Sequence, residues 1–338
     1  MTGKYFTVDA EFHHIPLEAA KLAAKVAAPS HEIDFRDRIE KPGAAQNLMF
    51  DPEAQLRHMD ECGIDMAMVG AASWSEPGLE VCRAINDGMA KLVKTYPGRF
   101  IPLAHVPYLE GQPGVDELDR AVTQLGLKGV TVLTSAQNTR LDDDRLKPFF
   151  KKASQLAVVV MVHPTTRMPI WGGEKYSMSA GISREYEILK AFVEVLQGVL
   201  PENPDLKFLF SHYGGGVPFL LAKIMSYYPA KGAPPQVGGG GKPKTIREFE
   251  DLGLKKEFNR LLDRMYINLA GAGGWMPAVK QALISIKPER LCFATDYPFE
   301  MRRPADLKAY LAGIKRLDIP EKDKANILGG NMKRLFRV

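Results

Sequence analysis

Short apolar runs alternate with amphipathic segments along the whole chain. Eight nearly continuous apolar runs begin at Tyr5, Ile64, Phe100, Lys128, Ala157, Leu206, Met265 and Leu291. Between them lie segments with apolar residues at helical spacing, such as PEAQLRHMDECG and SREYEILKAFVEVLQGVL. Strands that are apolar along their whole length and are separated by helices are typical of a parallel sheet buried on both faces. Eight such units predict an α/β fold, a closed (β/α)8 TIM barrel.

A doubly wound open sheet is the competing fold, but the glycine-rich turn expected after its first strand is missing. The letters EFHHIP stand there instead. The length of 338 residues suits one barrel domain over residues 1–338. Two segments are longer than ordinary loops, so we expect insertions near residues 17–50 and 229–262. The second contains the Gly- and Pro-rich stretch AKGAPPQVGGGGKPK.

Composition and charge narrow the class of partner. The net charge of +5 comes from basic residues scattered among acidic ones, without a basic block, so we expect no nucleic-acid partner. The start, MTGKYFTVDA, lacks a secretory apolar core, and the run LAVVVMV is too short to span a bilayer. Three cysteines at unrelated spacings predict neither a disulfide framework nor a thiolate metal site. These features together predict a cytoplasmic protein without a membrane partner.

Side chains that bind metals stand at the ends of four predicted strands. They are Glu11 and His13, His163, His212 and Asp296. A barrel brings the carboxyl ends of its strands to one rim, where catalytic residues of this fold lie. Because the chain has only seven histidines and three of them end strands on this rim, a joint role is favoured over three separate packing roles.

Strand geometry selects among the candidates at the first strand. Side chains alternate between the two faces, so Glu11 and His13 share one face and His14 takes the other. We predict Glu11, His13, His163 and Asp296 as direct metal ligands. Imidazole and carboxylate suit a divalent transition ion, with Zn²⁺ the first candidate and Mn²⁺ an alternative.

The remaining histidines receive other roles. His212 is predicted to lie beside the metal as an acid, a base or a donor to the substrate. His14 and His105 are predicted to pack in the core or to support the metal ligands, and His58 is predicted to lie in a helix or at the surface. Candidates for walls of the pocket are Trp171, Trp275, Tyr297 and Phe299.

Five motifs carry a family resemblance that spans nearly the whole chain. They are DAEFHHIP, MVHP, PENPDLKFLFSHYGGGVPF, FATDYPFE and NILGGNMKRLF. The pattern resembles the metal-dependent amidohydrolase superfamily, in the branch with aminocarboxymuconate semialdehyde decarboxylase and γ-resorcylate decarboxylase. Glu11 replaces the first histidine of the usual His-x-His, as in the γ-resorcylate decarboxylase group. Gly214-Gly215-Gly216 replaces the Gly-Glu-Gly of the aromatic decarboxylases, which favours the glycine-rich version of the muconate-semialdehyde decarboxylase and oxalomesaconate hydratase relatives.

The resemblance implies non-oxidative decarboxylation of a small unsaturated or aromatic carboxylic acid. The metal would orient and polarise the substrate, Asp296 would carry the proton, and His212 would bond to the substrate and tune that acid. Arg167, in HPTTR, is either a partner for a substrate carboxylate or a solvated loop residue. The resemblance also implies a homo-oligomer, a dimer or a tetramer.

A second enzyme class needs the same residues. In a hydrolase or hydratase the metal would lower the pKa of a bound water to roughly 7, and Asp296 would take its proton. The sequence does not separate this alternative from decarboxylation. A barrel that keeps the metal for structure alone ranks last, because structural sites are usually closed by four ligands and these residues lie on an open rim.

Overall fold

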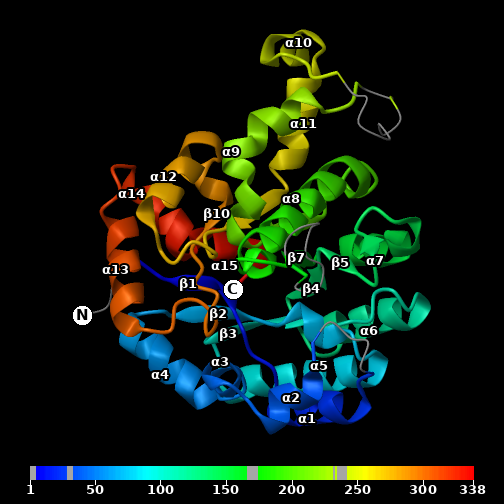
Figure 1. The fold of residues 1–338 in the computed structure, drawn as a ribbon, viewed down its shortest axis with the longest axis vertical. Helices are drawn as coiled ribbons and strands as arrows, with labels where there is room; N and C mark the ends of the chain where they lie inside the picture. Colours follow the sequence, from blue (N-terminus) through cyan, green and yellow to red (C-terminus); the bar gives the residue numbers. More distant parts are fainter. Residues whose placement is uncertain (1–4, 29–32, 166–173, 231–232, 234–241) are drawn as a thin grey trace.

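Eight parallel strands form the centre of the protein in a computed structural model that describes residues 5–28, 33–165, 174–230, 233 and 242–338 (Figure 1). In sheet order the strands are β1 (Val8–Phe12), β2 (Met66–Val69), β3 (Phe100–Ala104), β4 (Gly129–Leu133), β7 (Val159–His163), β8 (Lys207–Phe210), β9 (Met265–Asn268) and β10 (Leu291–Cys292). The first and last meet where the Ala10 N–H donates to the Phe293 carbonyl at 2.9 Å. The His13 N–H donates to the Tyr297 carbonyl at 2.7 Å. The sheet therefore closes, and the predicted (β/α)8 barrel is confirmed.

Helices connect the strands and surround the barrel. The connecting helices are α4 (Pro52–Cys62), α5 (Leu79–Thr95), α6 (Gln112–Thr123), α7 (Lys147–Gln155), α8 (Arg184–Glu194), α9 (His212–Ser226), α12 (Met276–Ser285) and α13 (Pro304–Lys315). Their ends follow local sequence rules. The Asp51 side chain accepts from the Ala54 N–H and begins α4, with Pro52 in its first turn, and Gly63 ends it in a left-handed conformation.

Additional elements lie in the two segments where insertions are predicted. After β1 come α1 (Leu17–Val26), α2 (Phe35–Glu40) and α3 (Ala44–Met49), and between α9 and β9 come α10 (Ile246–Asp251) and α11 (Leu254–Leu262). Figure 1 shows α10 at the upper end of the molecule, away from the strands, and α1 and α2 at the opposite end. A small hairpin, β5 (Ser135–Ala136) and β6 (Thr139–Arg140), follows β4. No helix in the described ranges is both long enough and apolar enough to cross a bilayer.

The last helices close one end of the barrel. After α14 (Glu321–Ala325), α15 (Asn331–Phe336) places Met332, Leu335 and Phe336 in one cluster with side chains from inside the barrel. Gly129, which begins β4, lies so near Phe336 that an added Cβ would stand 2.9 Å from its ring. The amino ends of the strands are therefore plugged by apolar packing, and the carboxyl ends remain available for a site.

An irregularity in β1 sets the direction of its polar residues. Asp9 pairs with Ala67 and Phe12 pairs with Val69, so β1 holds one more residue than β2 over this stretch. Val8 and Ala10 face the barrel interior, and strict alternation from them would turn Glu11 outward. The bulge reverses the alternation, so Phe12 packs in the outer core while Glu11 and His13 face inward.

Candidate metal centre

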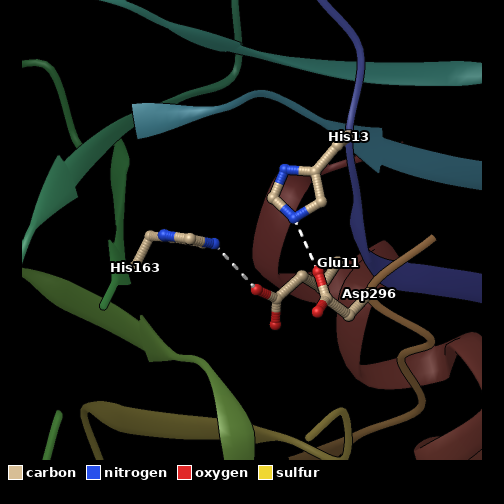
Figure 2. Close-up of side chains that lie close together, drawn as sticks. All are labelled: Glu11, His13, His163 and Asp296. Carbon is tan, nitrogen blue, oxygen red and sulfur yellow. Dashed lines mark hydrogen bonds and ion pairs between the residues drawn. The ribbon is translucent and has the colours of Figure 1, made fainter. Parts of the chain in front are cut away.

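Four side chains converge at the open end of the barrel. Glu11 lies in β1 and His13 follows it, His163 ends β7, and Asp296 follows β10 (Figure 2). All four are buried, and one ligand atom of each lies within 4.8 Å of the others. His13 Nε2 is 2.7 Å from Asp296 Oδ1, and His163 Nε2 is 3.5 Å from Glu11 Oε1. The structure thus brings together all four residues that the sequence nominates as ligands.

The donor atoms of this cluster suit a divalent cation. The Nδ1 atom of His13 donates to the Gly70 carbonyl and that of His163 to the Pro164 carbonyl, each at 3.0 Å. Both Nε2 atoms therefore face the cluster. His13 Nε2 donates to Asp296 Oδ1, and an ion would take the place of that proton and bind both Nε2 lone pairs, in the manner of metal-binding histidines whose second nitrogen is held by a backbone group. Within the described residues, the buried His163 Nε2 has no hydrogen-bond partner, as expected of an atom placed to bind an ion.

Two residues that sequence reasoning missed hold the Glu11 carboxylate. The Ser211 hydroxyl donates to Oε1 at 3.0 Å, and the Asn268 side-chain amide donates to Oε2 at 2.7 Å. Asn268 Oδ1 in turn accepts from the His212 N–H at 3.1 Å. Ser211 follows β8 and Asn268 ends β9, so the signal that singled out the ligands, a polar residue at a strand end, could have found both.

His212 lies beside the four clustered residues, but it does not end a strand. It begins α9, and His212 to Gly216 all have positive φ, from 48° to 89°. Such a left-handed turn is unfavourable by about 1–2 kcal/mol for each residue with a Cβ, and glycine avoids that penalty. Gly214, Gly215 and Gly216 therefore permit the turn that presents His212 to the site.

The contacts of His212 place it between two acidic groups. Its Nδ1 donates to Glu185 Oε1 at 2.9 Å. Its Nε2 lies 3.8 Å from Glu11 Oε1 and 3.9 Å from Asp296 Oδ2, and it has no hydrogen-bond partner among the described residues. The imidazole is thus anchored at one nitrogen and presents the other to the site.

Burial and charge act against each other across the cluster. Burial raises the pKa of Glu11 above its usual value, and it would raise that of Asp296 too, but the hydrogen bond and charge of His13 hold Asp296 below its usual range. Burial opposes the charged form of His212, yet Glu11 and Glu185 raise its pKa to about 9. Burial, aided by the charge of His13, lowers the pKa of His163. Asp296 is therefore an anion and His212 a cation at neutral pH.

A cavity of about 150 Å³ opens above the cluster. Its lining includes His13 and His163, the apolar side chains Ile33, Met49, Trp74 and Phe299, and the cations Arg38 and Arg184. A cavity of this volume is large enough for a benzene ring. Phe299 thus lines the pocket as predicted, whereas Tyr297 packs between Phe12 and His58 at ring distances of 4.5 and 4.2 Å.

The other predicted residues lie apart from the cluster. His14 is buried, with its Nδ1 3.1 Å from Gln55 Oε1. His105 is also buried, and its Nε2 accepts from the Ala71 N–H. The Trp275 side chain is 65% exposed at the start of α12, outside the lining of this cavity. The predicted substrate contact Arg167 and the predicted wall residue Trp171 lie outside the described residues.

The fold and the site together define a (β/α)8-barrel protein with a candidate metal centre of imidazole and carboxylate groups at the carboxyl ends of its strands. The chain belongs to the amidohydrolase family, whose model matches residues 8–338. This membership confirms the family expected from the motifs.

Relatives of this chain are named as decarboxylases. The chain is 26% identical over 303 residues to 2-amino-3-carboxymuconate-6-semialdehyde decarboxylase of Dictyostelium discoideum, covering 83% of this chain and 75% of that protein. It is 25% identical over 313 residues to γ-resorcylate decarboxylase of Rhizobium sp. (strain MTP-10005), covering 85% and 87%. A solved structure of 5-carboxyvanillate decarboxylase from Novosphingobium aromaticivorans, complexed with manganese, has a TM-score of 0.78 at 20% identity, covering 99% of this chain and 97% of that one. At this level of identity, the similarity to the solved structure shows a shared fold only.

Proposed function

We propose that this protein is a metal-dependent carboxy-lyase that removes CO₂, without an oxidant, from a small aromatic or unsaturated carboxylic acid. The observation that carries the proposal is the buried cluster of Glu11, His13, His163 and Asp296 beneath a cavity of ring size. The decarboxylases named among the relatives support this class, and none of the three relatives reported above is named a hydrolase or hydratase.

Four side chains would hold the ion: Glu11, His13, His163 and Asp296. A divalent ion there would supply positive charge that orients and polarises a substrate carboxylate and an adjacent oxygen. Two imidazole nitrogens and two carboxylates suit both Zn²⁺ and Mn²⁺. Elemental analysis of the purified protein, followed by reconstitution with each ion in turn, distinguishes them.

Asp296 and His212 are placed to manage the proton that the reaction needs. When the bond to the carboxylate breaks, CO₂ leaves and its bonding electron pair stays on carbon, which must then receive a proton. Asp296 is an anion at rest, so it must first take up a proton before it can deliver one. The protonated His212 is a proton source beside that carboxylate: its Nε2 lies 3.9 Å from Asp296 Oδ2, longer than a hydrogen bond, so the two groups must move closer before the transfer.

Isotopes separate decarboxylation from the hydrolytic alternative. Metal-loaded protein is incubated in D₂O with the acids named for its relatives: resorcylate, carboxyvanillate and aminocarboxymuconate semialdehyde. We expect release of CO₂ and one deuterium at the carbon that lost it. Incorporation of ¹⁸O from labelled water without CO₂ release, across this panel, would instead make the protein a hydrolase or hydratase.

Substitution of Asp296 tests the proton carrier. Asp296→Asn keeps the shape but cannot carry a proton, and general acid–base catalysis contributes about 10²–10⁴-fold, so turnover should fall by at least that factor. Bound metal is measured in the same variant, because Asp296 is also a proposed ligand. Turnover within threefold of the parent, at full metal occupancy, would exclude Asp296 as the carrier.

The proposal extends to the setting in which the enzyme works. We propose one barrel domain over residues 1–338, with insertions near 17–50 and 229–262, assembled as a homo-oligomer in the cytoplasm. All three cysteines are free and buried, which suits a reducing compartment. Light scattering coupled to gel filtration measures the assembly, and a monomer at micromolar concentration would contradict it.

A further inference from the structure

Arg184 is a cation in the wall of the cavity above the metal cluster, and among the described residues it has no ion pair. It begins α8, is half-buried, and lines the same cavity as His13 and His163. Its Nε is buried without a hydrogen-bond partner, and the described residues offer the side chain no ion pair. The neighbouring Glu185 bonds to His212 instead.

Among the described residues, Arg290 also has a buried Nε without a hydrogen-bond partner, but its Nη1 donates to the Tyr266 hydroxyl at 2.9 Å. Arg120, by comparison, reaches the carboxylates of Glu117 and Asp87 at 2.8 Å. A buried donor without a partner is unfavourable by about 1–3 kcal/mol, and more when it belongs to a charged group. The planar fork of arginine matches a carboxylate with two parallel hydrogen bonds. An anionic group of a molecule in the cavity would satisfy Arg184.

The chemistry indicates which anionic group that would be. The ion would already orient the reacting carboxylate, and this group loses its charge as CO₂ leaves, so a second cation on it would stabilise the substrate more than the transition state. Binding energy from a group that does not react carries no such penalty, because that group keeps its charge throughout. Arg184 would therefore assist the reaction more by binding a second anionic substituent, one that does not react.

We propose that Arg184 binds a non-reacting carboxylate of the substrate, so that the enzyme prefers diacids to monoacids. The proposal rests on the proposed function, because it assumes an acid in the cavity above the metal cluster. Arg184, the first residue of α8, would then determine substrate specificity. The expected substrate is a small ring or chain with two acidic groups.

Calorimetric binding of simple acids to the metal-loaded protein tests this specificity. The probes are benzoate and the three benzenedicarboxylates. We expect at least one dicarboxylate to bind more tightly than benzoate in the parent protein. Arg184→Gln should weaken that dicarboxylate about 10- to 100-fold, the range for one charge-assisted hydrogen-bonded pair, and leave benzoate within twofold. Arg184→Lys, which keeps the charge, should weaken it less. Arg247→Gln, at an exposed residue of α10, is the matched control.

The outcomes separate this proposal from the proposed function. If benzoate and all dicarboxylates bind the parent equally, or if Arg184→Gln weakens both kinds of acid by the same factor, Arg184 does not select diacids and the decarboxylase proposal stands. If no acid binds the metal-loaded parent at millimolar concentration, both proposals fail.

A separate observation concerns Glu185 and its bond to His212. With Nδ1 donating to Glu185 Oε1 at 2.9 Å, the proton of a neutral His212 is held on Nδ1, and Nε2 is presented to the site. A Cβ on Gly215 would stand 2.1 Å from the Glu185 carbonyl, so α8 packs directly against the turn that presents His212.

We infer that Glu185, supplied by α8, is the positioning residue that orients His212 in this chain. The residue does not touch the cavity in the lining described above, so it acts through the imidazole. Its effect should therefore vanish when His212 is absent.

A double-mutant cycle and a spectroscopic measurement test the role of Glu185. Glu185→Ala should lower kcat about 10- to 100-fold in the parent, the usual loss when a group that orients an active-site histidine is removed, and cause no further loss in a His212→Asn background. Glu185→Gln, which still accepts from Nδ1, should retain more activity than Glu185→Ala. Glu187→Gln is the control on the same helix, because Glu187 accepts from Ser135 instead.

Nitrogen NMR of histidine-labelled protein gives a readout that does not depend on turnover. In alkaline solution, where His212 has lost its second proton, it should show the remaining proton fixed on Nδ1 in the parent and in Glu185→Gln, but a mixture of tautomers in Glu185→Ala. Either of two results would overturn the inference. One is that the losses of kcat in the two single variants multiply in the double variant, and the other is that the tautomer of His212 is unchanged in Glu185→Ala.

Discussion

The carboxylate of Glu11 is held on both oxygens, by Ser211 and by Asn268, while it faces His163 and His212. A group fixed in this way is oriented before any ion arrives, which lowers the entropy lost on binding. Replacing the Glu11 carboxylate by an amide would keep most of the side-chain shape and remove the charge. The role of the negative charge in metal binding can therefore be tested separately from the shape.

Glu11→Gln should therefore weaken metal binding while the fold persists. Loss of a group that merely supports a ligand weakens metal affinity about 10- to 100-fold, so loss of a ligand charge should reach at least the upper end of that range. Competition with a metal-indicator dye measures the affinity. His14→Ala, which removes a side chain bonded to Gln55, is the control and should change affinity by less than threefold. Equal losses in the two variants would contradict the assignment of Glu11 as a ligand.

His105 should make stability depend on pH. Burial lowers its pKa from 6.5 to about 4, so between these values the unfolded chain binds a proton that the folded chain does not. Stability then rises with pH across this window and is lost as pH falls from 6.5 towards 4, by about 2 kcal/mol between pH 7 and pH 5.

The comparison of parent and His105→Gln isolates this contribution. The free energy of unfolding of the parent, measured with denaturant, should fall more steeply from pH 7 to pH 5 than that of the variant. Other buried histidines titrate in both proteins and cancel. Parallel curves would show that His105 has an ordinary pKa.

At the scale of elements, the contact between α8 and the start of α9 supports the site. Gly215 has φ of 66°, and a Cβ there would stand 2.1 Å from the Glu185 carbonyl and 2.6 Å from the Leu189 N. The left-handed turn that presents His212 and the helix that carries Glu185 can therefore approach only because this position lacks a side chain.

Gly215→Ala should destabilise the protein by at least about 2 kcal/mol, because backbone strain and overpacking add. It should also reduce kcat through displacement of Glu185. Gly181→Ala is the control, since no neighbouring atom of the described residues lies within 4 Å of the added Cβ. Thermal unfolding of the two variants checks the prediction. Equal unfolding temperatures would show that α8 moves away from the added methyl group without loss of stability.

At the scale of the whole molecule, the barrel has one plugged end and one functional end. The apolar side chains of α15 fill the amino ends of the strands, while imidazole and carboxylate groups from β1 and the residue after it, from β7 and from the segment after β10 gather at the carboxyl ends. Residues that are far apart in the chain meet there only when the barrel closes, so an ion bound by these four residues would couple metal binding to folding.

Removal of the ion should therefore destabilise the whole fold as well as abolish turnover. An ion present at a thousand times its dissociation constant stabilises the folded state by about 4 kcal/mol, which corresponds to a rise of roughly 5–10 °C in unfolding temperature. Calorimetry before and after chelation measures the shift, and Zn²⁺ or Mn²⁺ should restore it. Activity and unfolding temperature that both survive chelation would exclude a bound ion.

The alternation of apolar strands with helices was sufficient to predict the barrel, because each unit shows its period locally. Polar residues at strand ends were sufficient to predict that Glu11, His13, His163 and Asp296 meet, because a barrel brings all carboxyl ends to one rim. Cys292 and Ala294 face the interior, and Asp296 continues that alternation into the site.

Tertiary structure alone decided the details that make a site of these residues. The bulge in β1 depends on its pairing with β2, and it is what turns Glu11 inward. Glu185 and Arg184 follow a long connection after β7, where no periodic signal indicates which residues return to the cavity. Such contacts arise between segments far apart in the chain, and their geometry is set by packing. Local sequence patterns can therefore identify the strand ends but not these partners.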